Sequence, residues 1–305
     1  DLVTLQDHIN QINSQIWAGG KKVYKNVTDN FGLEPTGSFN ELNLTATMTV
    51  LWLAPYQNYA GFFNSADLYS KAYEGNSNEC KMVYLYFDGG SEALFNYGST
   101  LAHELQHMIN FYQKKLNNKY EEAWLDEAMS GYAEHIAGYS IVSGSNASKA
   151  RLVRDFLANP QSNDLTSWAG SVSDYGQAYL FGLWLAEKYG SNGSVKTLLS
   201  QNAVGIPAVS AFAGGRAFAE IVKNWQLGLY INDTTGDTVY GYKNFSLRNT
   251  YSNVTLSGPA NAHVGTITVA RNAAAYVEVA APTTATTLTW TVPTTLSVFE
   301  LNKNW

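Results

Sequence analysis

The 305-residue sequence predicts an α+β protein with a small all-β domain at its C-terminal end. Two apolar, β-branched stretches in the first third of the chain are typical of strands, and long runs with helical apolar spacing follow them. From about Gly236 the pattern changes to short alternating runs broken by Gly, Pro, Asn and Thr, as in a β-sandwich. We therefore expect one unit over residues 1–235, sheet-containing at about 1–115 and helical at about 116–235, and a β-sandwich-like unit over 236–305.

The N-terminal elements are expected to be one helix and two strands. LVTLQDHINQINSQIWAGG begins near the N-terminus, places apolar residues at helical intervals and stops at a Gly pair. LNLTATMTVLWLAPY, at 42–56, is β-branched and apolar up to a proline, which predicts a buried strand. KMVYLYF, at 81–87, alternates and is closed by DGG, which predicts a second strand.

Helices are expected over the rest of the first unit. A long helix runs from about Glu92 to Lys115, and a second helix, which carries EEAWLDEAMSGYAEHIAG, ends near Gly138. More helix is expected at 147–158, at 175–189 after a Ser173/Asp174 cap, at 194–201 and at about 215–230.

Composition excludes several classes of function. A net charge of −6 with scattered lysines and arginines argues against nucleic acid, which needs a clustered basic face. No apolar run approaches the ~20 residues of a membrane span. Only 14% of residues are charged, and the neutral-polar surface with 20 Tyr is common in secreted proteins. The chain opens at Asp1 without a leader, so we expect a processed or trimmed chain. We also expect a secreted protein and a monomer. The single Cys80 allows no internal disulfide.

GSTLAHELQHMINF, residues 98–111, places two histidines and a glutamate in a segment otherwise built to be buried. His103 and His107 are four positions apart, so a helix presents both imidazoles on one face. That spacing suits two ligands of one tetrahedral ion. Glu104, displaced by about 100°, lies beside the ion, where it can take a proton from bound water. The alternative is a helix whose histidines only pack or hydrogen-bond. The HExxH pattern favours a zinc site with Glu104 as general base.

A third ligand is available downstream. A catalytic zinc keeps three protein ligands and one open position for water. Glu127 lies twenty positions after His107, and a turn and a second helix fit in that gap, so its carboxylate can close the site. The alternative is a surface glutamate, but the neighbouring residues are apolar and indicate an inward-facing turn: Trp124, Leu125, Ala128 and Met129.

TLAHELQHMINF followed by WLDEAMSGYAEH resembles the zinc metallopeptidases whose third ligand is a glutamate, the thermolysin-like and aminopeptidase-like group. Within that group the combination is most similar to the hyicolysin type of secreted bacterial neutral metallopeptidase. The resemblance covers about residues 45–190 and implies a zincin-like body. It also implies that His103, His107 and Glu127 are zinc ligands and that Glu104 is the base.

Partners for the ligand imidazoles can be placed by the same resemblance. Metal-bound imidazoles usually donate their second N–H to a carboxylate or carbonyl. Thermolysin has a carboxylate four residues after the ligand glutamate, where this chain has Gly131, a departure. The aminopeptidase-like branch has one seven residues after, which is Glu134 here and lies on the same helix face. Asp126, just before the ligand, is the other candidate; the alternative for both is charge on a helix surface.

A peptidase also needs a donor for the oxyanion of the tetrahedral intermediate. SDYGQAYLFGLWLAEKYG resembles the aminopeptidase-like segment in which a tyrosine at a helix start is that donor. The match places Tyr175 there, with Tyr179 one turn on as the second candidate, against a purely structural role.

Other signals are weaker. NDTTGDT, at 232–238, has oxygen ligands at alternate positions, so calcium is a second candidate metal, but the bidentate closing acid is missing and an exposed turn is favoured. His135 follows Glu134 but lies at the wrong angle to join the ligands.

The reaction expected of this set is amide hydrolysis on protein or peptide substrates. Aminopeptidases of the group carry a Gly-x-Met-Glu-Asn segment that holds the free N-terminus, and this chain has none, which favours an endopeptidase with an open cleft. We expect KMVYLYF to be the edge strand that pairs with an extended peptide. Two alternatives are a non-catalytic surface binding or adhesion protein that retains the fold, and a zinc amidase for cell-wall or glycan-linked substrates.

Overall fold

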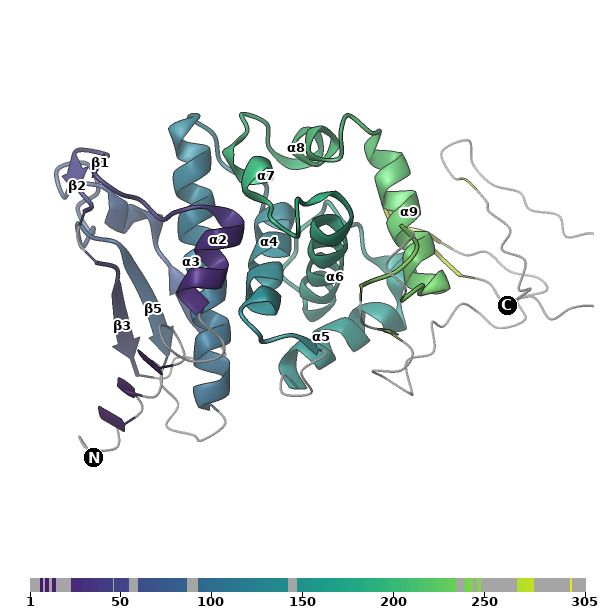
Figure 1. The fold of residues 1–305 in the computed structure, drawn as a ribbon, viewed down its shortest axis with the longest axis horizontal. Coiled ribbons are helices and arrows are strands. Elements are labelled where there is room, and N and C mark those ends of the chain that lie inside the picture. The colour runs from purple at the N-terminus through teal and green to yellow at the C-terminus, as the bar shows by residue number, and fades with distance from the viewer. Residues whose placement is uncertain are drawn as a thin grey trace, which may run out of the picture.

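The protein has an α+β architecture in the computed structural model, which confirms the expected class (Figure 1). The structure describes residues 6–7, 9–10, 13–14, 23–45, 47–54, 60–86, 93–141, 147–234, 239–243, 246–247, 268–276 and 297. A small sheet lies on one side of a long helix, and further helices lie on the other side (Figure 1). Most of the predicted β-sandwich-like unit over 236–305 and most of the predicted N-terminal helix fall outside the described residues.

The sheet has three described strands in the order β3-β5-β4: β3 (Thr49–Leu53), β5 (Met82–Tyr86) and β4 (Gly61–Phe63). β3 runs parallel to β5, whereas β4 runs antiparallel to it. Val83 and Leu85 of β5 are fully buried in the core that the sheet shares with the long helix. β1 (Ser38–Phe39) and β2 (Leu42–Asn43) form a separate antiparallel pair.

The single buried strand expected over 42–56 is wrong, because the segment contains two short strands, β2 and β3. The Asn43 side chain accepts hydrogen bonds from both the backbone amide and the hydroxyl of Thr45, a local turn that competes with strand pairing. β3 is also only half-buried. Trp52 packs edge-on against Tyr97 of the long helix, but Leu51 keeps 39% of its surface exposed.

The expected helices are largely confirmed. Long α3 (Ala93–Leu116) and α4 (Ala123–Ile136) match the two predicted around the motif, and α5 (Ala147–Ala158) matches the third. Among the helices that the structure describes, none is both long and apolar enough to cross a membrane. The remaining helical elements are α2 (Val23–Phe31), α6 (Val172–Tyr189), α7 (Lys196–Ser200), α8 (Gly205–Phe212), α9 (Phe218–Ile231) and the 3₁₀ turns η2 (Ser65–Leu68) and η4 (Pro160–Ser162).

Three details of the helices differ from expectation. α2 begins three residues after the Gly pair and was not expected. α6 begins three residues earlier than predicted, because Ser171 rather than Ser173 is its cap. Ser171 and Asp174 exchange side-chain-to-backbone hydrogen bonds in a capping box. α8 was not expected, since GIPAVSAF is apolar throughout and has no clear helical face.

α4 lies between α3 and α6 (Figure 1), and glycine allows its close approach to α6. A Cβ added at Gly182 of α6 would lie 2.2 Å from the backbone oxygen of Ala128 in α4, a separation that no real side chain tolerates. Because Ala128 follows Glu127 directly, this contact also helps to place the predicted ligand relative to the bundle.

Gly182→Ala is therefore expected to push α4 away from α6 and to lower the free energy of unfolding by about 1–3 kcal/mol, a typical cost of overpacking. Gly75→Ala is the matched control, since a Cβ there meets nothing within 4 Å and the change should stay within about 0.5 kcal/mol. Urea unfolding of both variants measures the difference. Equal stabilities would show that α4 can shift at no cost.

Segments beyond residue 235 pack against the helical part. Tyr242 is fully buried; its hydroxyl accepts from the Trp225 indole and donates to the backbone oxygen of Leu180. Further on, Arg271 pairs with Asp164 at 2.9 Å. The described C-terminal residues thus contact the helices around α6 and α9, while the division of the chain at 235/236 stays a prediction.

Candidate active site

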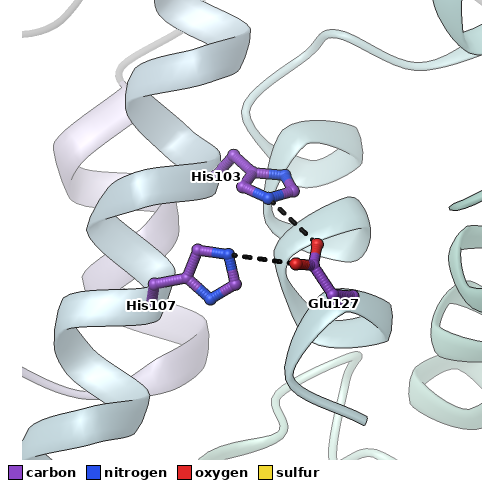
Figure 2. Close-up of side chains that lie close together, drawn as sticks. All are labelled: His103, His107 and Glu127. Carbon is purple, nitrogen blue, oxygen red and sulfur yellow. Dashed lines mark ion pairs between the residues drawn. The ribbon is translucent and has the colours of Figure 1, made fainter. Parts of the chain in front are cut away.

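Two helices bring the predicted ligands together. α3 presents His103 and His107 on one face, and α4 presents Glu127 opposite them (Figure 2). The Nε2 of His103 lies 3.2 Å from one oxygen of Glu127, and the Nε2 of His107 lies 3.9 Å from the other. One ligand atom from each residue lies within 4.8 Å of the other two. The helical spacing of HExxH and the turn before α4 thus create a single point of convergence.

The donor set fits a zinc ion. Two imidazole nitrogens and one carboxylate oxygen are a set that catalytic zinc takes in proteins, with a fourth position left for water. The Oε2 of Glu127 is buried without a hydrogen bond, and His103 Nε2, 3.2 Å away, has no proton to donate to it when the imidazole is neutral with its proton on Nδ1. An unsatisfied buried carboxylate oxygen is costly, and a cation between the three side chains would remove that cost. Among the described residues, only His103, His107 and Glu127 form a cluster of this kind.

The second nitrogen of each imidazole meets a carboxylate. His103 Nδ1 lies 3.0 Å from Glu134, and His107 Nδ1 lies 2.9 Å from Asp126. These contacts favour the tautomer with its proton on Nδ1, in which the Nε2 lone pair is directed at Glu127. This is the tautomer that binds a metal through Nε2. The structure therefore places both predicted partners against the ligands, while their functional role stays a prediction.

Each of these two carboxylates has further donors that the sequence reasoning missed. Ser99 and Lys149 donate to Glu134, the latter at 2.7 Å, and Asn110 donates to Asp126. Ser99 and Asn110 could have been found from helical spacing, since they lie one turn before His103 and one turn after His107 on α3. Lys149 lies on α5, and no spacing rule connects it to the motif.

The electrostatics of the site come from this packing of acids and bases. Burial alone would raise the pKa of Glu134, but the charges of Lys149 and His103 outweigh it and lower that pKa to about 2. Burial would lower the pKa of His107, but Asp126 outweighs it and raises that pKa to about 9. Without a metal the imidazoles therefore favour the protonated form, and a binding cation must displace those protons.

Glu104 is buried, with 7% of its surface exposed, next to the two imidazoles. Burial raises the pKa of this carboxyl above its ordinary value, although the neighbouring His103 and His107 act in the opposite direction. A backbone hydrogen bond from Phe63 of β4 also holds the carboxylate. The strand beside α3 therefore orients the predicted base.

β4, not β5, is the strand closest to this chemistry. KMVYLYF was expected to be an edge strand, and this prediction is wrong: β5 has β3 on one side and β4 on the other. A strand with partners on both sides has no free N–H and C=O groups to offer a peptide. Alternation within KMVYLYF identifies a strand but does not say which neighbours it acquires.

The two candidate oxyanion donors are placed differently. Tyr175, in the first turn of α6, is half-buried with its ring edge-on to Trp168, at 4.8 Å between centroids. Tyr179 is buried, and its hydroxyl lies 2.8 Å from Nδ1 of His135. This contact engages the Tyr179 hydroxyl with His135, and the choice of Tyr175 as the oxyanion donor stays a prediction. His135 is absent from the convergent cluster, as expected.

Gly131, four residues after Glu127, lies where two helices pack closely. A Cβ at Gly131 would lie 3.2–3.3 Å from the Cβ and Cα of Tyr179, where α4 crosses α6. A side chain there would need Tyr179 to give way by a few tenths of an ångström. Glu134, one turn further along α4, is the acid that reaches His103. The departure from the thermolysin pattern thus agrees with the close packing of α4 and α6.

A cavity of about 290 Å³ opens beside His107 and Asp126, with Phe63, Ser65 and Phe111 as its other walls. The two phenylalanine rings lie 6.1 Å apart and supply its aromatic surface. Of the predicted calcium loop, residues 235–238 lie outside the described residues.

Comparison with known proteins identifies the family. The family model for peptidase M30 matches residues 53–236, from the end of β3 to just beyond α9, and so includes every residue of the site described above. No curated protein matches the chain. The match bears out the resemblance to hyicolysin-type metallopeptidases at the level of the family. With more than half of its length matched, the chain belongs to the peptidase M30 family.

Proposed function

We propose that this peptidase is a secreted zinc-dependent endopeptidase. The observation that supports the proposal most is the convergence of His103, His107 and Glu127 on one point, with the acid Glu104 beside it. Family membership makes the protein a peptidase acting on proteins or peptides, and the donor set supports a metal requirement for that activity. When bound, zinc would supply Lewis acidity at the substrate carbonyl.

Residues of the chain would transfer the proton, stabilise the oxyanion and orient the ligands. The Glu104 carboxylate accepts a proton from the attacking water and passes it to the nitrogen of the leaving amine. The Tyr175 hydroxyl donates a hydrogen bond to the carbonyl oxygen as negative charge develops on it. Glu134 and Asp126 hold the two imidazoles in orientation through Nδ1.

An extended substrate is expected to lie along β4. In the part of the sheet that the structure describes, β4 pairs with β5 on one side only, and the Phe63 amide reaches Glu104 from this strand. Pairing there would present a peptide bond to the site, with an adjacent side chain directed at the cavity lined by Phe63 and Phe111. Such a substrate needs no free terminus, which favours internal cleavage.

The decisive experiment incubates the protein with a denatured protein mixture, with and without a chelator, and sequences the fragments. We expect internal cleavage that the chelator abolishes and added zinc restores, because loss of the metal removes the Lewis acid. Cleavage that survives chelation would overturn the metal dependence, and release of single terminal residues would overturn the endopeptidase. Bound zinc without hydrolysis would indicate a non-catalytic binding protein.

Secretion is inferred from composition, and a monomeric state is proposed with it. Only 14% of the residues are charged, and the surface-type residues are mostly neutral and polar, as in many secreted proteins. Recovery of the native protein from the culture medium and light scattering of the purified chain test these two points.

A further inference from the structure

We propose that Lys149 is a positioning residue of the zinc site, acting on the ligand His103 through Glu134. This inference rests on the proposed zinc site and goes beyond it, because Lys149 touches no ligand directly and lies on a helix, α5, outside both motifs. Its ammonium lies 2.7 Å from Oε1 of Glu134, and the same oxygen lies 3.0 Å from Nδ1 of His103.

Lys149 is almost fully buried, which is unusual for a lysine. Only 3% of its surface is exposed, and its ammonium also lies over the Tyr179 ring, 4.8 Å from the centroid. The Tyr179 hydroxyl is in turn hydrogen-bonded to His135, so the ring below the ammonium is fixed. A buried ammonium costs several kcal/mol in lost hydration unless it is paired. A carboxylate and an aromatic face are among the partners that offset this cost here.

The contacts of Glu134 leave its carboxylate one orientation. Lys149 and His103 share Oε1, and the Ser99 hydroxyl donates to Oε2. With three donors on two oxygens, rotation of the carboxylate would break at least one charge-assisted hydrogen bond. The imidazole of His103 is therefore held with Nε2 toward Glu127.

The two ligand histidines differ in this respect. Asp126, which holds His107, receives the neutral amide of Asn110, whereas Glu134 receives a cation. Four carboxylates surround the zinc position: Glu104, Glu127, Glu134 and Asp126. Lys149 offsets one of these negative charges without occupying a place beside the metal. It thus keeps the Glu134 carboxylate ordered on the side of the site that α5 covers.

The first test replaces Lys149 with methionine, which keeps much of the buried volume and removes the charge. We expect the zinc affinity, measured by competition with a chromogenic chelator, to fall by about 10-fold, near the lower end of what loss of an outer partner costs. Arg151→Met is the matched control, since Arg151 is an exposed cation on the same helix, and its zinc affinity should not change. Thermal unfolding of the metal-free proteins separates any loss of fold from loss of zinc.

The second test is a double-mutant cycle with Glu134→Gln. If Lys149 acts through Glu134, then Lys149→Met should weaken zinc binding in the wild type but add little in the Glu134→Gln background. Lys149→Arg, which keeps the charge, should recover part of the affinity. If Lys149→Met alone fails to fold, the double variant removes both buried charges together and can still be compared with Glu134→Gln.

Each outcome bears on one proposal. Wild-type protein that binds no stoichiometric zinc would overturn the proposed function itself. Wild-type protein that binds zinc, together with an unchanged affinity in Lys149→Met, would overturn only the role of Lys149. Additive losses in the cycle would do the same, because they would mean that Lys149 acts independently of Glu134.

Discussion

Glu104→Gln is expected to keep the fold and the zinc but to lower the rate of peptide hydrolysis by about 10²- to 10⁴-fold, the usual contribution of a general base. Glutamine has the shape of glutamate, and its amide oxygen can still accept from the Phe63 backbone, so the buried site should stay packed. It cannot take a proton from water. The loss should therefore appear in kcat, measured on a peptide that the wild type is shown to cleave, with zinc content unchanged.

Glu74→Gln is the control for this variant, because Glu74 is exposed and lies outside the site. It should leave both kcat and zinc content unchanged. Full activity of Glu104→Gln would mean that another group moves the proton, and the assignment of the base would be lost. A variant that has lost zinc as well would instead indicate that Glu104 is needed to build the site.

Glu127→Ala is expected to abolish hydrolysis for a different reason, which is loss of the metal. Removal of one ligand of three should lower zinc affinity by more than about 100-fold, beyond the cost of removing an outer partner. The alanine also leaves His103 and His107 without the carboxylate that both face. Zinc content after dialysis, measured by atomic absorption, checks this result.

Zinc binding by variants of Glu127, Glu134 and Asp126 tests which of these carboxylates is a ligand and which are outer partners. Glu134→Gln and Asp126→Asn remove acids that lie against Nδ1 of the imidazoles, so each should weaken zinc binding by about 10- to 100-fold. Glu127→Ala should exceed both. An equal effect of all three substitutions would contradict the division between ligand and outer partner. If the Glu127→Ala variant retained zinc, Glu127 would not be a zinc ligand.

Much of the helical structure could be predicted from the sequence because helical periodicity is local. The boundaries of α3 and α4 follow from apolar spacing, and the same spacing places His103 and His107 on one face. The spacing also predicted that Glu127 lies within reach of the two histidines, because a short connection makes two consecutive helices pack against each other. In each case the relevant residues are close in sequence.

The sheet was predicted less well, since strand neighbours are chosen by contacts between distant segments. KMVYLYF was recognised as a strand, but its central position depends on β3 and β4, which arrive from elsewhere in the chain. The break between β2 and β3 depends on one side-chain turn at Asn43. Alternating patterns identify strands and leave their order open.

By itself, the sequence determined the family, the two helices of the site and the identity of the convergent side chains, because all of these depend on residues within a few helical turns. Only the tertiary structure decided which groups surround that site. The contact between α4 and α6 left little room for a side chain at Gly131, and α5 brought Lys149 to Glu134. These contacts depend on how helices far apart in sequence pack. The energetic effect of a buried charge or of an absent Cβ is set by the atoms that surround it in the folded protein.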